Sequence, residues 1–437
     1  MSIDNPFYHR GAIREASEFH GREAEIEQVL GLLRNGQSVS VIGPRRIGKS
    51  SLLLHLRRPQ VRKQLNLDSE QALFVLIDCQ ELGGAPAEEV YETLLNALYD
   101  AAQEAGVPIE DVQREGTYRT LDRFLRQLSQ RGTAAVIMLD EFELLAGNEL
   151  LTPYFFARLR GLTTKHGLAF LTASQRPLFA VTAKQEILSS PFFNIFVTMP
   201  LGLFSEAEAR ALLQCRLEPT PIRFTDGLIE YLLFLVGPHP FFLHIAGYHA
   251  FQTLRRGQPL ENERDWAQLD RLIEVEAHSH LGYLWRNLTA EEQYALAIAD
   301  GPIDNLRLLE QQCLLQEQDG AYEYTSEILQ RFVRRQQVEG LIQAGPFVID
   351  LQRHQVWANG QELSLTTSQF SILIRLCQHA GQVVHGNDLE TAVWGDVLVN
   401  DPDRLKTLIK RLRRAIVPYE GWIISERGVG YALRPPD

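Results

Sequence analysis

A glycine-rich motif at residues 43–50 constrains the fold of this 437-residue chain more than any other feature. It reads Gly-Pro-Arg-Arg-Ile-Gly-Lys-Ser, the P-loop spacing G-x-x-x-x-G-K-S, in which successive backbone N–H groups cradle phosphate oxygens. An apolar run precedes the motif and an apolar-periodic run follows it, which predicts the strand, loop and helix that the motif requires. In that setting we expect Lys49 to reach the β- and γ-phosphates and Ser50 to offer its hydroxyl to Mg²⁺.

Apolar, strand-like runs alternate with helical patterns in the first part of the chain. The runs lie at residues 38–42, 72–78, 134–139, 168–172 and 195–199. Such alternation predicts an α/β domain, that is, a mostly parallel sheet with helices on both faces. Because ligands of these sheets bind where the strands end, the residues that follow each run are candidates for chemistry.

Two of these strand ends carry charged side chains. Asp140 closes the third run, where a carboxylate can hold Mg²⁺ directly or through water. Glu141 is placed to orient or deprotonate the attacking water, whereas Glu143 is interpreted as a surface residue. Arg176 follows the fourth run, and the sequence leaves open whether it senses the γ-phosphate or is an ordinary surface arginine. The candidate catalytic residues are therefore Glu141, Lys49 and Arg176, and the candidate metal ligands are Ser50 and Asp140.

The bulk composition limits the class of protein. A net charge of −12 argues against a chain that binds nucleic acid over its whole surface, so a binding site for nucleic acid must be local. The four cysteines are far apart and show no metal-ligand spacing, which favours reduced thiols. Residues 1–11 lack the apolar stretch of a secretion signal, and Gly237-Pro238-His239-Pro240 interrupts the longest apolar region. We therefore expect a cytoplasmic protein of two to four domains without a membrane span.

The pattern becomes helical from residue 203 onward. Ser205, with Glu208 three residues later, predicts a capping box at the start of a helix. Helical patterns continue to about residue 256 and predict a lid behind the sheet, in which His244 is interpreted as a packing or solvated histidine. Residues 288–337 combine helices with a short β-like run, which suggests a small winged-helix unit.

The C-terminal part carries a second chemical signal. Short strands separated by polar turns, among them the hairpin signal Asn359-Gly360, lead into three helices and a closing hairpin. The third helix, residues 401–416, has an apolar face and a basic face, and a helix of this kind fits a DNA major groove. Taken alone, the helix is equally consistent with a solvated basic face. The candidate DNA-binding residues are Arg404, Lys406, Thr407, Lys410, Arg411, Arg413 and Arg414 of this helix and Arg427 of the hairpin.

Residues 5–338 resemble the STAND class of P-loop ATPases, which is related to AAA+ proteins. The resemblance rests on Phe19-His20-Gly21-Arg22-Glu23, the motif at 43–50, Met138-Leu139-Asp140-Glu141-Phe142, the strand ending at Arg176, and Gly237-Pro238-His239-Pro240. It implies a nucleotide-binding domain, a helical lid and a winged helix that close around ATP or ADP, with slow hydrolysis used as a switch. It also implies that Gly21 and Arg22 lie near the adenine and that Pro240 packs on the base. The histidine that the family's winged helix often supplies has no counterpart at Tyr324-Thr325-Ser326.

The nucleotide contacts that this resemblance implies, together with the motif, form one set. They are Gly21, Arg22, Gly43, Pro44, Arg45, Arg46, Ile47, Gly48, Lys49, Ser50, Ser51 and Pro240.

Residues 346–435 resemble the winged-helix effector domain of OmpR/PhoB-type response regulators. Leu365-Thr366, Val393-Trp394-Gly395, Arg411-Leu412-Arg413-Arg414 and Arg427-Gly428-Val429-Gly430-Tyr431 stand where that family has its signatures. The resemblance implies that the basic helix is a DNA recognition helix. The sequence shows no phosphoacceptor receiver domain, so nucleotide state would replace aspartyl phosphorylation as the input.

These patterns predict an order of domains along the chain. It comprises an N-terminal arm (1–20), a P-loop nucleotide-binding domain (21–202), a helical lid (203–282), a winged helix (283–338), a linker (339–345) and an OmpR/PhoB-type DNA-binding domain (346–437). We expect a transcription regulator switched by ATP or ADP with Mg²⁺, which binds double-stranded DNA, forms nucleotide-dependent homo-oligomers and answers an upstream protein or ligand signal. One alternative is an AAA+-like DNA-dependent ATPase, an initiator or loader. Another is a C-terminal module that binds protein instead of DNA.

Overall fold

The structure, a computed structural model, describes residues 4–8, 10–63, 71–110, 115–177, 191–351, 353–395 and 403–436. The chain divides into two compact units, Met1–Leu233 with Pro238–Leu269, and Phe234–Gly237 with Asp270–Asp437. Helix α13 (Glu263–Arg286) begins in the first unit and ends in the second. The predicted boundary between lid and winged helix, at residues 282 and 283, falls inside this helix.

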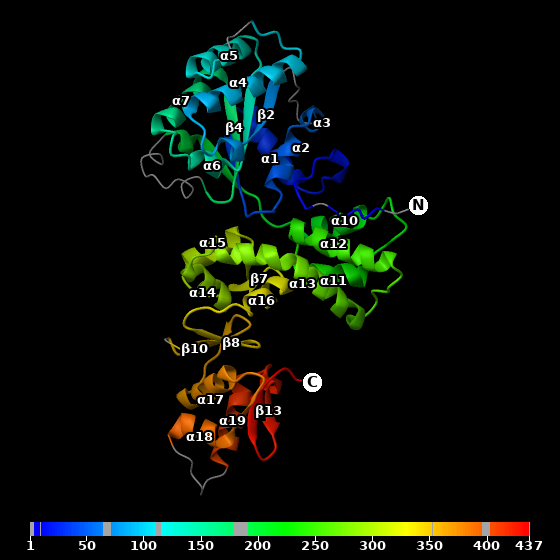
Figure 1. Ribbon diagram of the computed structural model, residues 1–437, viewed down its shortest axis with the longest axis vertical. Helices are drawn as coiled ribbons and strands as arrows, with labels where there is room; N and C mark the ends of the chain where they lie inside the picture. The colour runs from blue at the N-terminus through cyan, green and yellow to red at the C-terminus, as the bar shows by residue number, and fades with distance from the viewer. Residues whose placement is uncertain are drawn as a thin grey trace. The chain divides into compact units, whose positions relative to one another are not determined.

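A five-stranded sheet in the order β2-β3-β4-β1-β5 forms the centre of the first unit (Figure 1). Its strands are β1 (Ser38–Ile42), β2 (Ala72–Asp78), β3 (Ala134–Asp140), β4 (Leu168–Ser174) and β5 (Phe196–Pro200). Each neighbouring pair is parallel, so the predicted α/β fold is confirmed. Because Ile42 pairs with Ser174, the P-loop and the end of β4 leave the sheet at the same edge.

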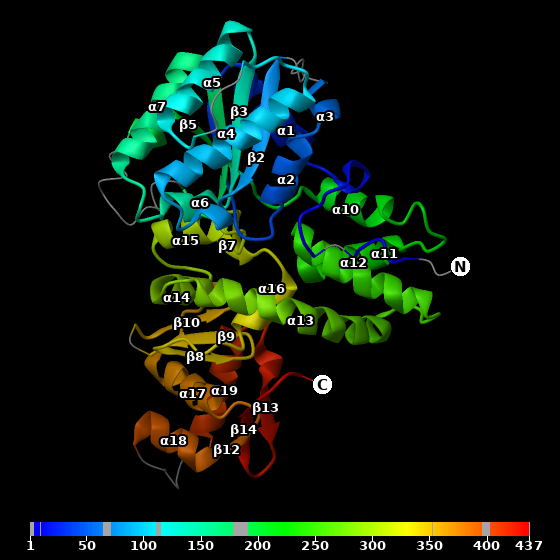
Figure 2. The same cartoon turned by 45° about the horizontal axis from the view of Figure 1, so that its top comes forward.

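Helices cover this sheet because their apolar residues recur at helical spacing. Helices α4 (Ala87–Glu104), α5 (Tyr118–Gln130) and α7 (Pro153–His166) contact β2, β3 and β4 respectively, and Figure 2 shows α4 lying across β2 and β3. Helix α1 (Glu23–Arg34) contacts β1, and α2 (Lys49–Leu56) contacts β3 and β4. Shorter elements are α3 (Pro59–Lys63), α6 (Phe142–Ala146) and the 3-10 turns η1 (Ala16–Glu18), η2 (Cys79–Leu82) and η3 (Pro191–Ile195).

Helices α10 (Glu206–Cys215), α11 (Asp226–Val236) and α12 (Pro240–Arg255) follow the sheet. The predicted capping box is present, because Ser205 and Glu208 exchange side-chain to backbone hydrogen bonds at the start of α10. Pro240 is the first residue of α12, a position where its missing N–H costs nothing. Among the described helices, none is both long and apolar enough to cross a membrane.

The second unit contains two small modules that each mix helices with short strands. The first consists of α14 (Ala290–Ile298), α15 (Ile303–Gln311), the antiparallel pair β6 (Leu315–Gln318) and β7 (Ala321–Tyr324), and α16 (Glu327–Val333). The second begins with a sheet in the order β11-β10-β9-β8, built from β8 (Leu341–Ala344), β9 (Phe347–Asp350), β10 (Gln355–Ala358) and β11 (Gln361–Glu362). Strand β8 lies within the predicted linker and pairs with β9, so most of that segment belongs to the sheet.

The rest of the second module is the winged helix that the sequence predicts. It comprises α17 (Thr367–Gln378), α18 (Gly386–Trp394), α19 (Arg404–Ala415), the turn η4 (Glu420–Trp422) and a sheet of β12 (Val383–His385), β14 (Gly430–Leu433) and β13 (Ile423–Glu426). The predicted helix start at residues 401 and 402 lies outside the described residues. The buried residues of α19, among them Leu408 and Leu412, pack with those of α17 in one core.

Candidate nucleotide site and nucleic-acid interface

The P-loop is shaped by residues with positive φ angles. Arg46 (φ 70°) and Gly48 (φ 109°) turn the chain from β1 into α2, which starts at Lys49. Gly43 lies so close to the Leu201 carbonyl oxygen that an added Cβ would overlap it. The glycine spacing therefore serves both the turn and the close packing of the loop on the segment after β5.

Lys49 lies at the centre of this loop and is 5% exposed. Its ammonium donates hydrogen bonds to the carbonyl oxygens of Gly43 at 2.8 Å and Pro44 at 3.0 Å. Burial lowers the pKa of Lys49, and the nearby carboxylates, Glu141 first among them, act in the opposite direction. A cation in this position can neutralise an anionic ligand that enters the loop.

Three carboxylates stand near this ammonium, on β3 and the residues that follow it. Burial raises the pKa of Asp140, and a hydrogen bond from Ser50 opposes that rise. The Asp140 carboxylate also accepts the N–H of Glu141 at 3.1 Å. Glu141 itself adopts a left-handed conformation (φ 49°), a strained state for a residue other than glycine. Asp140 and Ser50, the two predicted metal ligands, are thus in contact.

Glu143 is a further acidic residue of this site, and its interpretation as a surface residue is wrong. Its Oε1 accepts the backbone N–H of Gln175 at 3.2 Å, and its Oε2 is buried without a hydrogen-bond partner among the described residues. Burial raises the pKa of Glu143. Gln175, which follows β4, also extends its side-chain amide to Glu141 at 3.5 Å. The third carboxylate thus connects the end of β4 to the acidic residues after β3.

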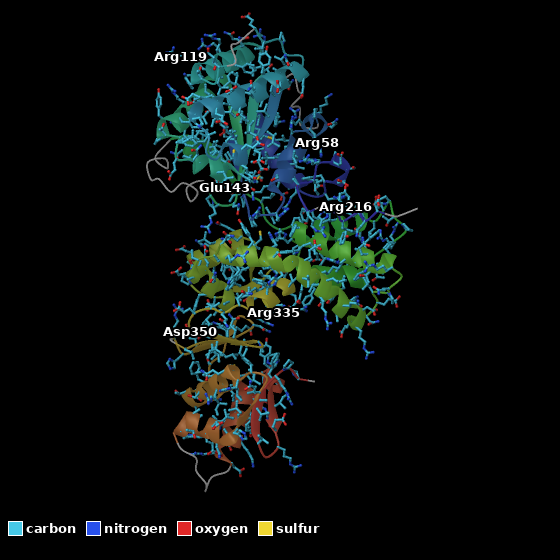
Figure 3. The ribbon with its side chains drawn as sticks, viewed as in Figure 1. Arg58, Arg119, Glu143, Arg216, Arg335 and Asp350 are labelled. Atoms are coloured by element: carbon cyan, nitrogen blue, oxygen red, sulfur yellow. The ribbon has the colours of Figure 1, made fainter. Side chains whose placement is uncertain are left out.

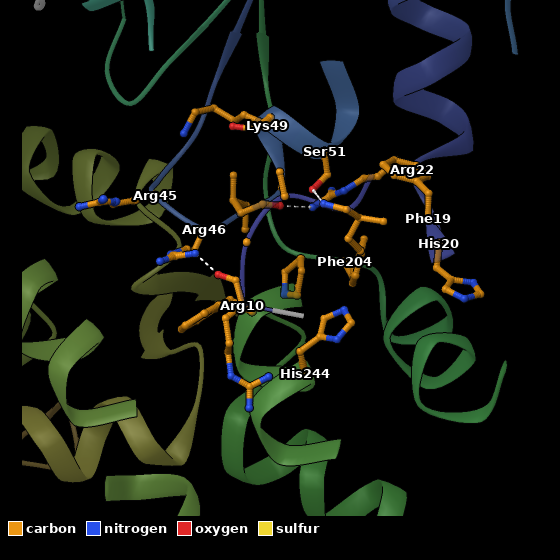
Figure 4. Close-up of a pocket in the computed structure, with 18 of the residues that line it drawn as sticks. Arg10, Phe19, His20, Arg22, Arg45, Arg46, Lys49, Ser51, Phe204 and His244 are labelled. Carbon is orange, nitrogen blue, oxygen red and sulfur yellow. Dashed lines mark hydrogen bonds between the residues drawn. The ribbon is translucent and has the colours of Figure 1, made fainter. Parts of the chain in front are cut away.

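A cavity of about 260 Å³ opens beside the P-loop (Figure 4). Its walls come from the arm, the loop, Glu141 and the lid. The lining residues from the predicted nucleotide set are Arg22, Arg45, Arg46, Ile47, Gly48, Lys49, Ser50, Ser51 and Pro240. Other predicted residues, namely Gly21, Gly43, Pro44, Asp140 and Arg176, are not among those that line it. Arg176 is exposed at the end of β4.

Arg22 is held by the protein itself. Its side chain is almost fully buried, and the guanidinium donates to the Gly202 carbonyl oxygen at 2.6 Å and pairs with Glu25 at 2.8 Å. Its backbone N–H donates to Glu208 of α10 at 2.7 Å. An added Cβ at Gly21 would lie 2.9 Å from the same carboxylate. The Gly-Arg pair therefore fastens the start of α1 to the start of α10 beside the cavity.

The N-terminal arm supplies cavity residues that the sequence did not reveal. Arg10, Ile13, Phe19 and His20 line the cavity, and the Ile13 N–H donates to the Ser51 hydroxyl at 3.0 Å. The guanidinium of Arg46 donates to the Arg10 carbonyl oxygen. Within the arm, only the aromatic residues could have indicated from the sequence that it packs against the rest of the protein.

The lid adds Phe204, Leu212, Phe241 and His244 to the same wall. His244, interpreted from sequence as a packing or solvated histidine, is buried in α12 and also lines the cavity.

Helix α19 exposes most of the predicted DNA-contact residues. Lys406, Thr407, Lys410, Arg411 and Arg414 are exposed, as is Arg427 in the turn between β13 and β14. Arg404 and Arg413 differ from these. The guanidinium of Arg404 pairs with Glu390 at 3.1 Å and lies over the Trp394 ring at 4.3 Å. The guanidinium of Arg413 donates to the Ile423 carbonyl oxygen at 3.1 Å. These two arginines fix α19 against α18 and β13.

Comparison with known protein families matches both parts of the chain. Residues 27–301 match the family described as Novel STAND NTPase 2, and residues 360–433 match the family described as Transcriptional regulatory protein, C terminal.

Curated relatives match the C-terminal part. The sensory transduction protein RegX3 of Mycolicibacterium smegmatis is 34% identical over 98 residues, which are 22% of this chain and 43% of that protein. The two-component response regulator PhoP of Pseudomonas aeruginosa is 35% identical over 96 residues, again 22% and 43%. The chain thus spans less than half the length of these curated relatives.

Among solved structures, the Walker-type ATPase paby2304 of Pyrococcus abyssi is similar with a TM-score of 0.54 and 18% identity. The match covers 75% of this chain and 99% of that one. At this identity the likeness concerns the fold.

Proposed function

The chain belongs to the Novel STAND NTPase 2 family and carries a C-terminal OmpR/PhoB-type DNA-binding domain, and from this premise we propose that it is a nucleotide-switched transcription regulator. ATP or ADP occupies the cavity beside the P-loop, and α19 binds double-stranded DNA. The observation that carries the proposal is the presence, in one chain, of a cavity lined by arm, P-loop and lid and of a helix with exposed basic residues. The input is nucleotide state, and the output is DNA binding.

The acidic residues fit a Mg²⁺ ion that accompanies the nucleotide. Ser50 and Asp140 are in contact and offer one hydroxyl and one carboxylate. The part of the chain that the structure describes has no cluster of three or more His, Cys, Asp or Glu residues suited to a metal ion. Few protein ligands suit Mg²⁺, which keeps several waters and also binds substrate phosphates. When bound, the ion neutralises charge that develops on the phosphates.

The chain's own residues then have distinct roles in hydrolysis. Lys49 binds the β- and γ-phosphates, and Glu141 orients or deprotonates the attacking water. Arg176 contacts the γ-phosphate once the nucleotide is bound, which its exposed position after β4 permits. Hydrolysis is slow and acts as a timer, and the ATP form assembles into homo-oligomers when an upstream signal arrives.

DNA affinity in defined nucleotide states tests this function. The full chain is titrated with DNA fragments from its own promoter region in the presence of a non-hydrolysable ATP analogue, ADP or no nucleotide. We expect different affinities in the three states and one affinity throughout for Lys49→Ala. Equal affinities in all states of the wild type would reject the switch.

The same preparation distinguishes the alternatives. Glu141→Gln is expected to bind ATP normally and to hydrolyse it more slowly than the wild type, whereas normal turnover would remove Glu141 from its role. Fast turnover stimulated by DNA, together with ring assembly, would indicate a loader or initiator. A C-terminal module that binds protein would leave DNA affinity unchanged in Arg411→Ala.

A further inference from the structure

The sheet at the start of the C-terminal module is buried on both faces. Along β9, Phe347 and Ile349 belong to the core formed with α17, whereas Val348 between them points to the other side. Val348 packs there with Trp357 of β10 and Ile298 at the end of α14, and each of these three side chains is at most 7% exposed. Figures 1 and 2 both show α14 on the side of the sheet opposite α17. The outer face of the sheet is therefore an interface with the first winged helix.

Polar contacts hold the same interface. The Tyr294 hydroxyl of α14 donates to the carboxylate of Asp350 on β9, a residue labelled in Figure 3. Asp350 is 3% exposed and also accepts the Arg353 N–H at 3.0 Å. The Arg353 guanidinium lies over the Tyr294 ring at 5.2 Å. Separating the two modules would break the bond between Tyr294 and Asp350 and would also expose the apolar side chains of Ile298, Val348 and Trp357 to water, which is costly.

A second set of contacts extends from α16 to the recognition helix. Arg334, directly after α16, donates to the Asn359 side-chain oxygen in the β10–β11 hairpin. The Asn359 amide in turn donates to the Tyr419 hydroxyl at 2.6 Å. Tyr419 follows α19, and its ring packs edge-on against Phe347 at 6.0 Å. The end of α19 is thus tied to the sheet that the first winged helix covers.

The first winged helix also contacts Gly237, which precedes α12 and belongs to the same unit of the chain as this winged helix. Gly237 has a φ of +64°, and an added Cβ there would overlap the Thr325 carbonyl oxygen. Three residues later in the chain, Pro240 lines the cavity. On another side of this winged helix, Arg331 pairs with Asp270 of α13 at 2.9 Å. Gly237 thus contacts the first winged helix inside the second unit, and the backbone joins it to Pro240 of the first unit.

We propose that the interface of α14 and of Arg334, directly after α16, with the β8–β11 sheet, which we call the joint, connects the nucleotide switch to the DNA-reading helix. The joint makes the two winged-helix modules one rigid body, so α19 moves whenever the first winged helix moves. If a flexible tether joined the two modules, the position of α19 would not depend on the bound nucleotide. Coupling between the nucleotide site and the DNA-binding site requires a structural element whose conformational equilibrium both sites shift. This role rests on the proposed function, whereas the rigidity of the joint does not.

Hydrogen exchange of the full chain, read by mass spectrometry, tests the joint without nucleotide. Val348→Lys places a charge between Ile298 and Trp357, and its matched control is Val383→Lys on β12 of the same module, where the side chain is 39% exposed. We expect Val348→Lys to speed exchange in α14 as well as in its own strand, and Val383→Lys to leave α14 unchanged. Unchanged exchange of α14 in Val348→Lys would overturn the joint.

The role of the joint is tested by the ratio of DNA affinities with an ATP analogue and with ADP. Tyr294→Phe is the second variant, because it removes one hydroxyl and keeps the ring. Allosteric pairs couple by about 5- to 150-fold, and we expect that ratio to fall to about twofold or less in both variants while ATP hydrolysis stays at the wild-type rate. A wild-type ratio retained in both variants would overturn the role. Equal DNA affinities of the wild type with the ATP analogue and with ADP would overturn the proposed function. Hydrogen exchange would still decide whether the joint is rigid.

Discussion

Phe7→Ala is expected to release the N-terminal arm and weaken nucleotide binding. Phe7 is 0% exposed, and its ring stacks on Phe224 with centroids 5.9 Å apart. It also fills the space beside Gly247, where an added Cβ would lie 2.5 Å from the ring. An aromatic side chain buries about 150–250 Å², which at about 25 cal/mol per Å² contributes about 4–6 kcal/mol. Because an undocked arm already hides part of that surface, we expect a loss of about 3–5 kcal/mol, the usual range for Phe→Ala in a core.

This loss reaches the nucleotide site because the arm lines the cavity. Residues 10–13 form part of the cavity wall, and the Ile13 N–H donates to Ser51 next to the P-loop. Each 1.4 kcal/mol changes an equilibrium tenfold, so the docked population of the arm relative to the undocked one falls by about 100- to 4,000-fold. A nucleotide that needs the docked arm then binds with an apparent Kd raised by up to that factor.

Titration with fluorescent ADP measures the Kd, and hydrogen exchange of residues 10–19 reports whether the arm is docked. Tyr8→Ala is the matched control, since Tyr8 is the adjacent aromatic residue and is 56% exposed. We expect rapid exchange and weak binding in Phe7→Ala and near wild-type values in Tyr8→Ala. An arm that exchanges rapidly in Phe7→Ala while the Kd stays unchanged would refute the reasoning, because the arm would then not be part of the nucleotide site.

Four further outcomes are expected. Arg411→Ala should weaken DNA binding and reduce the slope of log affinity against log salt by about 1 in filter-binding titrations, because an exposed phosphate contact is lost. Arg404→Ala should instead lower the free energy of unfolding, measured with urea, by about 3 kcal/mol, since Glu390 loses its partner. Gly237 and Gly257 both have positive φ angles, φ +64° and φ +75°, so alanine is strained at either position. Gly237→Ala should nevertheless lower the thermal unfolding temperature more than Gly257→Ala, because only Gly237 faces a carbonyl oxygen. Burial raises the pKa of Asp122. The interactions with His166, Lys165 and Arg126 lower it, and their combined effect is larger, so the pKa of Asp122 is lowered. The ionised carboxylate therefore stabilises the fold at pH values above its ordinary pKa of about 4, and this stabilisation is lost as the pH falls further. The urea midpoint of Asp122→Asn should consequently drop less between neutral and strongly acidic pH than that of the wild type.

The sequence predicted the helices and strands whose formation depends on residues that are close together in the chain. The five apolar runs became the five strands of the parallel sheet. In the four strands other than the edge strand β5 most residues are buried, which favours apolar side chains. The Ser205–Glu208 capping box formed because its donors and acceptors lie within one turn of helix. The apolar face of α19 is buried as its spacing predicted. In each of these cases the residues that decide the structure are close in the chain.

The elements that were missed depend on contacts between distant residues. Strand β8 lies in a segment without a clear strand pattern, and its pairing with β9 completes it. Glu143 has the sequence pattern of a surface residue, but the backbone N–H of Gln175, which follows the next strand, donates a hydrogen bond to it. The arm lies at the cavity through contacts with residues far away in the chain, such as Phe7 against Gly247 of α12 and Ile13 with Ser51. No periodicity within these segments could have shown the partner that fixes each one.

The carboxylate of Glu208 shows how a locally predictable feature acquires a distant role. Its Oε2 caps α10 by accepting the Ser205 N–H at 2.8 Å, which the sequence predicts. Its Oε1 accepts the N–H of Arg22 at 2.7 Å, 186 residues away in the chain, which the sequence cannot predict. Two neighbouring helix starts beside the cavity thus share one negative charge, and negative charge stabilises the N-terminus of a helix. The segment around Gly21 and Arg22 and the lid helix α10 are therefore stabilised together, so a nucleotide that displaces either one must disturb the other.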